Sequence, residues 1–509
     1  MRQFVQHPLV LRLCALLLGG SLVFAYAPFD WGILGIIAPT LHILLVWQQQ
    51  PRETAKISYW FGLGWFAAGL SWIYVSIDQY GGLPWFATVG ILLLLFAYLA
   101  LFPALAFGLW QWLRNKHRAA TFTLPLLWLA AESLRGWLLT GFPWLSLGYT
   151  QTDGWLGQLA PWIGEVGITV VVLWIALCLA MVLRTRQPLL LLIPLVAWAC
   201  AYVLPQFSSL ERTGKTHSVL LVQGNVSQSL KWQAEQRWPT LLKYLDLTRP
   251  HYDHQVIVWP ESAITALEPY AGDVLASIND AANYNNSAII SGIIDYKQQT
   301  DEFYNSIIVL GKRSDDDPSS YRYGSSNRYQ KHHLLPIGEF VPFGDLLRPL
   351  APLFNLPMSS FSRGAYRQDN IIANNLKFSP AICYEMAFPE QLRENTRADT
   401  DALLTVSNDT WFGDSHGPWQ HMEIARMRAK ELGRPMLRAT NNGVSGIVDE
   451  RGRWLARAPQ FTATVLSADI PEVSGTTSYW RFGSLWAWLL GCLGILPLLA
   501  GLVRQKSLG

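Results

Sequence analysis

Three short segments of the sequence place a reactive side chain where a predicted strand ends. They are VIVWPES with Glu261, RYQKHHLLPIGEFVPFG with Lys331, and AICYE with Cys383. Residues at such positions can meet at one edge of a sheet, although they lie far apart along the chain. The thiolate is the nucleophilic form of cysteine, so Cys383 needs a base to take its proton or a cation to hold it ionised.

These three groups can divide the chemistry of a nucleophilic site among them. The Glu261 carboxylate can be the base, and the Lys331 ammonium would stabilise charge that develops on a substrate carbonyl oxygen. The amide N–H of Tyr384 could be a second donor to that oxygen. A single Glu, Lys or Cys is more often structural, so the prediction rests on their joint appearance in these contexts.

The other cysteines and the histidines indicate neither a disulfide framework nor a metal centre. Four of the five cysteines lie in apolar stretches, where they read as small hydrophobic residues: Cys14, Cys178, Cys200 and Cys492. Only Cys383 lies in polar sequence. His332 and His333 could be metal ligands, but no third ligand stands at a suitable spacing. We expect no metal and no cofactor.

A layered α/β domain is expected to position the reactive residues, because short apolar runs alternate with helical segments from His217 onward. The predicted strands are 218–222, 255–259, 287–293, 306–310, 381–383, 402–406 and 464–468. The predicted helices are 230–248, 270–284, 389–397 and 417–432. The segment 314–326 has the composition of an exposed loop.

The remaining sequence indicates a membrane protein. Of the 509 residues, 51% are hydrophobic and only 15% are charged, which is too apolar for an ordinary soluble chain of this length. The net charge of +3 gives no reason to expect nucleic-acid binding. Apolar runs of about 17 to 25 residues can cross a bilayer. Eight such runs are predicted: 8–26, 31–48, 57–77, 87–113, 121–138, 163–183, 188–205 and 482–503.

Basic residues predict the orientation of these spans, since lysine and arginine favour the cytoplasmic side. Successive spans place their connecting loops alternately on the two sides of the membrane. The basic residues that fall on one side are Arg2, Arg52, Lys56, Arg114, Lys116, Arg118, Arg184, Arg186, Arg504 and Lys506. Both termini are therefore expected inside. The predicted domains are a membrane domain of seven helices (1–205), an outer catalytic domain (206–481), and a last helix with its tail (482–509). The first run also resembles a signal peptide ending at Ala25-Tyr26-Ala27, although Pro28 argues against cleavage.

The motifs resemble those of the nitrilase, or carbon-nitrogen hydrolase, superfamily, whose members use a Glu-Lys-Cys triad in an αββα sandwich. Within it, the chain is similar to the membrane-bound apolipoprotein N-acyltransferase family of bacteria. The resemblance covers nearly the whole chain: several spans, QGN at 223–225, WPES, GEFVPFG, CYE, SNDTWFG at 407–413, and a final span.

This resemblance implies roles for individual residues. Glu261 matches the general base, Lys331 the oxyanion-stabilising lysine and Cys383 the nucleophile. The residues that match supporting positions are Glu339, Glu385, Tyr384, Trp232 and Trp411.

The resemblance also implies a reaction and its partners. Cys383 would take an acyl chain from a membrane phospholipid as a thioester, and then pass it to the N-terminal amine of a diacylglyceryl-cysteine on an apolipoprotein. A covalent intermediate splits the transfer into two steps. The expected location is the inner membrane, multi-pass, with the catalytic domain on the periplasmic side.

Two other functions fit parts of the sequence. A membrane-tethered amidase or nitrilase would use the same triad and let water resolve the thioester, but it would need one anchor at most. A transporter usually shows charged residues at midplane and related halves. The sequence shows one Glu/Arg pair, Glu132 and Arg135, which are three residues apart and can pair on one helix, and no obvious pairing of halves.

Overall fold

The computed structural model describes residues 7–317, 321–336, 338–340 and 360–507. Arg2 and the last four residues of GEFVPFG lie outside this part of the chain. The chain divides into two compact units. The first comprises the residues up to Asp78, Leu83–Ser208 and the residues from Ser478, and the second comprises Gln79–Gly82 and Ser209–Thr477.

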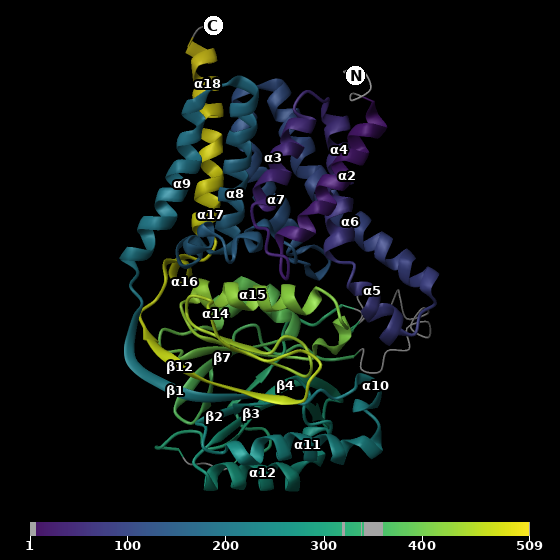
Figure 1. Ribbon diagram of the computed structural model, residues 1–509, viewed down its shortest axis with the longest axis vertical. Helices are drawn as coiled ribbons and strands as arrows, with labels where there is room; N and C mark the ends of the chain where they lie inside the picture. Colours follow the sequence, from purple (N-terminus) through teal and green to yellow (C-terminus); the bar gives the residue numbers. More distant parts are fainter. Residues whose placement is uncertain (1–6, 318–320, 337, 341–359, 508–509) are drawn as a thin grey trace. The chain divides into compact units, whose positions relative to one another are not determined.

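The first unit is built of helices that follow the apolar runs (Figure 1). The α-helices of eight or more residues are α2 (Pro8–Ser21), α3 (Leu34–Val46), α4 (Pro51–Gly69), α6 (Trp85–Lys116), α7 (Leu124–Arg135), α8 (Ala160–Thr185), α9 (Leu192–Val203), α17 (Leu485–Cys492) and α18 (Leu496–Ser507). Proline stands in the first turn of α2, α4, α7 and α8, where its missing N–H leaves no intrahelical bond unmade.

The count of eight membrane spans is not confirmed. Four helical segments in the described residues are long and apolar enough to cross a membrane: Pro8–Ala25, Trp85–Lys116, Trp155–Thr185 and Pro188–Phe207. Pro51–Gly69 with Ile73–Tyr80 would be a fifth, bent by 61°. Leu34–Val46 and Leu485–Gly501 are shorter apolar helices, and the run at 121–138 forms only the 12-residue α7.

The charged pair in α7 is structural. Arg135 is 1% exposed and forms an ion pair with Glu132. Its Nη1 also donates to the main-chain oxygens of Phe142 and Trp144, at 2.6 and 2.7 Å. The guanidinium therefore fixes the chain that follows α7 against the end of that helix.

The second unit contains two six-stranded sheets. The first has the order β12-β1-β2-β3-β4-β5, and the second has the order β11-β10-β9-β8-β7-β6. Their strands are β1 (Glu211–Gln223), β2 (Val256–Val258), β3 (Ala288–Lys297), β4 (Glu302–Gly311), β5 (Arg328–Gln330), β6 (Ile371–Ala373), β7 (Leu376–Ile382), β8 (Ala402–Ser407), β9 (Met436–Thr440), β10 (Gly446–Val448), β11 (Trp454–Arg457) and β12 (Thr464–Ser474). β1, β2 and β3 pair in parallel, as do β7, β8 and β9.

The sheets pack face to face, and helices cover their outer faces, which gives an αββα sandwich (Figure 1). Side chains alternate between the faces of a strand. In β2, Val256 and Val258 enter the core shared with Phe378 and Leu404 of the second sheet, while Ile257 enters the core on the other face. Both faces of β2 are buried, as expected for a central parallel strand.

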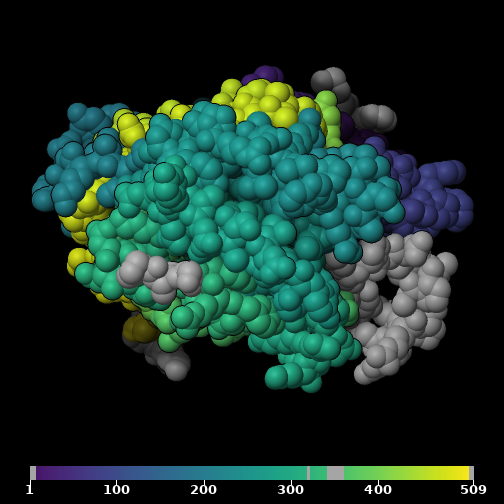
Figure 2. Space-filling model, turned by 90° about the horizontal axis from the view of Figure 1, so that it is seen from below, coloured from purple at the N-terminus to yellow at the C-terminus, as the bar shows by residue number. Residues whose placement is uncertain are grey.

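Helices α11 (Arg237–Thr248) and α12 (Gly272–Tyr284) cover the first sheet through residues such as Leu241 and Leu275. Figure 2 views the molecule from this side, and teal atoms of this part of the chain fill the middle of the view. Helices α14 (Pro389–Asn395) and α15 (Gly417–Leu432) lie on the second sheet (Figure 1). The seven strands and four helices expected from the pattern each overlap an element of the described chain.

A close approach of α2 to α4 offers a test of the packing in the first unit. A Cβ on Gly64 would lie 2.0 Å from the main-chain oxygen of Leu16, so Gly64→Ala should destabilise the protein by about 1–3 kcal/mol. Gly90→Ala is the matched control, because a Cβ there meets no atom within 4 Å. Thermal unfolding in detergent should show a lower midpoint for Gly64→Ala alone. Equal midpoints would contradict the close approach.

Candidate active site

Strand directions bring the three predicted residues to one end of the sandwich. Glu261 follows β2 and Lys331 follows β5. β3 is parallel to β2, β4 is antiparallel to β3, and β5 is antiparallel to β4, so β2 and β5 run in the same direction. Their carboxyl ends therefore share an edge of the first sheet. Cys383 follows β7 in the facing sheet.

The Glu261 carboxylate is buried and accepts a hydrogen bond on each oxygen. Asn305 Nδ2 donates to Oε1 at 2.8 Å, and the main-chain N–H of Asn408 donates to Oε2 at 2.9 Å. Burial raises the pKa of Glu261 and the Lys331 ammonium opposes this rise. A raised pKa suits a group that must both take and return a proton near neutral pH. Glu261 has the placement and the chemistry of a general base.

Gly292 on β3 makes room for the loop that carries Glu261. A Cβ at this position would lie 2.7 Å from the Glu261 Cα and 2.6 Å from the Ser262 main-chain nitrogen. Only a residue without a side chain allows the loop to cross the strand this closely.

Lys331 lies between two carboxylates. Its side chain is 2% exposed, and its Nζ is 2.7 Å from Glu339 Oε2 and 3.9 Å from Glu261 Oε1. Burial lowers the pKa of Lys331, but the two carboxylates outweigh burial and hold the pKa well above its ordinary value. Lys331 is therefore a fixed positive charge at this edge.

Cys383 begins a 3-10 turn (Cys383–Ala387) directly after β7. Its φ of 52° lies in the left-handed region, which is costly for a residue with a side chain. Burial raises the pKa of the thiol to about 12, helped by the Glu261 charge and opposed by Lys331. The Cys383 thiol is therefore protonated near neutral pH, and it would need a base in order to act as a nucleophile.

Glu385 ties the Cys383 turn to the Lys331 segment. One of its oxygens accepts from the main-chain N–H of Ile382, at 2.8 Å. The other accepts from the main-chain N–H groups of His332 and His333, at 2.8 and 3.0 Å. A single buried carboxylate therefore fixes the distance between two loops that come from different sheets.

The remaining predicted residues lie at different depths. Tyr384 is 5% exposed, and its ring packs edge-on against Phe388. Trp232 ends the short helix α10 (Gln228–Lys231), and Trp411 lies 36% exposed in the turn Asp409–Phe412. His332 Nδ1 bonds to the main-chain oxygen of Gly364 at 2.8 Å, which gives it a structural place beside Lys331.

Asn305 was not predicted from the sequence. Its Nδ2 donates to Glu261 Oε1 at 2.8 Å and to Glu339 Oε1 at 2.9 Å, so this one amide nitrogen bridges the two carboxylates. Asn305 directly precedes the strand predicted at 306–310 and belongs to no motif, although it lies within β4. The available signal was a polar amide next to the apolar run of this strand, since a polar side chain that is buried with such a strand needs a hydrogen-bond partner.

His421 was also missed. Its Nε2 is 2.9 Å from the main-chain oxygen of Cys383, and its Nδ1 is 3.1 Å from Arg438 Nη2. A guanidinium only donates, so Nδ1 accepts and Nε2–H donates to the Cys383 carbonyl. Arg438 also pairs with Asp409, at 2.6 Å. This buried chain holds the backbone of Cys383 from the side of α15.

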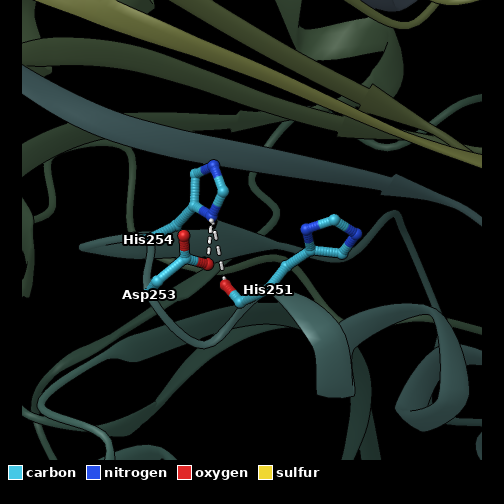
Figure 3. A group of neighbouring side chains, drawn as sticks. All are labelled: His251, Asp253 and His254. Carbon is cyan, nitrogen blue, oxygen red and sulfur yellow. Dashed lines mark hydrogen bonds and ion pairs between the residues drawn. The ribbon is translucent and has the colours of Figure 1, made fainter.

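One group of residues outside this edge has the composition of a metal site. Figure 3 shows His251, Asp253 and His254, whose potential ligand atoms lie within 4.8 Å of one another. They precede β2, at the end of that strand opposite Glu261. His254 Nδ1 already bonds to Asp253 Oδ1 and to the His251 main-chain oxygen, both at 3.1 Å. This group was not predicted from the sequence, in which His332 and His333 were the candidate metal ligands.

Comparisons with known proteins match both units of the chain. The family described as carbon-nitrogen hydrolase matches residues 219–479, and the one described as apolipoprotein N-acyltransferase N-terminal domain matches residues 18–178. A protein of Shewanella oneidensis named apolipoprotein N-acyltransferase is 50% identical over 97% of this chain and 96% of its own length. A protein of the same name from Vibrio parahaemolyticus is 46% identical over 96% of this chain and 97% of its own length.

Among solved structures, Saccharomyces cerevisiae Nit3, a member of branch 10 of the nitrilase superfamily, is 20% identical. It matches with a TM-score of 0.37 and covers 50% of this chain and 90% of that chain.

The protonated state of Cys383 can be tested by alkylation. With a pKa of about 12, the rate of reaction with iodoacetamide should rise tenfold per unit between pH 7 and 9 without levelling. In the Glu261→Gln variant, the alkylation rate should reach its plateau at a lower pH, because the negative charge that opposes thiolate formation is gone. Mass spectrometry of the peptide that contains residue 383 measures the rate. A plateau near the ordinary thiol pKa of about 8.5 in the unmodified protein would contradict this prediction.

Proposed function

Because this chain belongs to the apolipoprotein N-acyltransferase family, we propose that it transfers a fatty acyl chain from a membrane phospholipid to the N-terminal amine of diacylglyceryl-modified apolipoproteins. The observation that carries the mechanism is the arrangement of a protonated thiol, a buried carboxylate and a fixed ammonium at one end of the sandwich. In the proposed mechanism, Cys383 is the nucleophile, Glu261 is the general base and Lys331 stabilises the oxyanion.

In the first half-reaction, Glu261 takes the proton of the Cys383 thiol as sulfur attacks the ester carbonyl carbon. Lys331 Nζ, together with the main-chain N–H of Tyr384, stabilises the oxyanion. The carbon–oxygen bond then breaks, and Glu261 returns the proton to the leaving alkoxide. The products are the Cys383 thioester and a lysophospholipid.

In the second half-reaction, the acceptor amine attacks the thioester carbonyl. Glu261 takes a proton from the attacking nitrogen, the carbon–sulfur bond breaks, and Glu261 gives that proton to the leaving thiolate of Cys383. Glu339 and Glu385 support these steps by position: Glu339 holds the ammonium of Lys331, and Glu385 joins the Lys331 and Cys383 loops. Trp232 and Trp411 are proposed to lie along the path of the acyl substrates.

We place the reaction at the periplasmic face of the inner membrane. The distribution of lysine and arginine supports eight spans with both termini in the cytoplasm, a membrane domain at 1–205, a catalytic domain at 206–481 and a last span from 482. Both proposed substrates carry acyl chains in lipid. A membrane-anchored site therefore meets them without a search through water.

The proposed reaction predicts a trapped acyl-enzyme. Incubation of the purified protein in detergent with phospholipid labelled in its acyl chain, and without acceptor, should give hydroxylamine-labile label on the protein. Cys383→Ala should give none, and Cys14→Ala, a matched cysteine change, should label like the unchanged protein. Glu261→Gln should slow labelling by about 100- to 10,000-fold, the contribution of a positioned base.

The same experiment separates transferase from hydrolase. In the transferase, label should stay on Cys383 until a diacylglyceryl-cysteine peptide is added, and should then move to that peptide. Rapid loss of label as free fatty acid without acceptor would contradict the transferase. Intact phospholipid and unlabelled protein would contradict phospholipid as the donor.

A further inference from the structure

A second buried lysine lies beside the proposed base, and the two half-reactions do not use it. Lys231 ends α10 and is 1% exposed. Its Nζ donates to the main-chain oxygen of Glu261 at 3.1 Å and lies 5.9 Å from the centre of the Trp232 ring. An ammonium group has three hydrogen-bond donors. Burial of such a charged group is unfavourable unless a nearby negative charge compensates it.

The charges around the site indicate that the Lys231 ammonium compensates the Glu261 carboxylate. Lys331 Nζ is 2.7 Å from Glu339 and 3.9 Å from Glu261, so two carboxylates share the Lys331 charge. Asn305 and the Asn408 main chain donate to Glu261 but carry no charge. Lys231 supplies a second positive charge that lowers the pKa of Glu261, with a smaller effect than that of Lys331.

We propose that Lys231 is a positioning residue for acyl transfer, whose ammonium holds the Glu261 main chain and keeps the Glu261 carboxylate ionised. The inference rests on the proposed role of Glu261 as base. The hydrogen bond fixes the start of the Glu261–Ser262 turn, where Ser262 has a φ of 49°. The charge, acting through space, favours the ionised form of a carboxylate that burial would otherwise protonate.

The titration of Lys231 is consistent with this placement. Burial lowers the pKa of Lys231 to about 8, while Glu261 acts in the opposite direction. Within the described residues, the charged and titratable groups that act on Glu261 are Lys331, Glu339, Lys231 and Cys383. Of these, Lys231 is the one cation not already paired at short range.

The test is the pH profile of acyl-enzyme formation in the full-length protein in detergent. Glu261 must be ionised to take the thiol proton, and a nearby cation lowers its pKa. Lys231→Met, which keeps the volume and removes the charge, should therefore move the acidic limb of the profile upward by about one pH unit. At a pH on that limb, labelling should fall about tenfold. Lys231→Arg should keep the limb near its original position.

Lys243→Met is the matched control. Lys243 lies in the same unit, on α11, and its Nζ also donates to a main-chain oxygen, that of Asn225, at 3.4 Å. This variant should leave the profile unchanged. Equal loss of labelling at every pH in Lys231→Met, without a shifted limb, would reduce Lys231 to a packing role and overturn the proposal.

A measurement without substrate separates this proposal from the proposed function. Infrared difference spectra against pH report the carbonyl stretch of a protonated carboxyl group, assigned to Glu261 by its loss in Glu261→Gln. In Lys231→Met this band should persist to a higher pH, by about one unit. The shift should be present even if phospholipid proves not to be the donor. An unshifted band would overturn the role of Lys231 whatever the substrate.

Discussion

The catalytic unit depends on keeping a charged lysine where water cannot reach it. Lys331 is almost fully buried, and its charge persists because Glu339 lies at 2.7 Å and Glu261 at 3.9 Å. Two carboxylates this close would repel each other without the ammonium between them and the Asn305 amide that donates to both. The residues that meet here come from β2, β4 and β5 and the loops after them, so this cluster requires the first sheet to be complete.

Cys383 is held by a different set of contacts. Cys383 keeps a left-handed backbone because two contacts hold it. Glu385 accepts from the main-chain N–H of Ile382, and His421 donates to the main-chain oxygen of Cys383. Glu385 also binds the N–H groups after Lys331, so it joins the two sheets at the site. The second sheet thus supplies the thiol, and the first supplies the carboxylate and the ammonium that are proposed to act on it.

The long periodic elements and the motifs could be read from the sequence, whereas short strands and isolated partners could not. The helix predicted at 417–432 has those bounds in the structure, and the apolar run 255–259 contains β2. Strands β5 and β10 have three residues each and take their conformation from neighbouring strands, so they leave no periodic signal. Asn305 lacks a motif because its role is set by geometry across strands. Helix lengths in the first unit were overestimated at 31–48 and 121–138, where apolar residues continue through turns that end α3 and α7.

The protonated thiol explains how one small site can hold so many ionisable groups. A thiolate at rest would add a third negative charge beside Glu261 and Glu339, and burial opposes it, as the raised pKa of Cys383 reflects. A neutral thiol can be buried at little cost, and in the proposed reaction negative charge moves from Glu261 to sulfur only as the carbon–sulfur bond forms. The developing oxyanion then lies near an ammonium that is already in place and needs no reorganisation. The carboxylates of Glu261 and Glu339, together with the lysines beside them, therefore set the charge balance both before and during the proposed reaction.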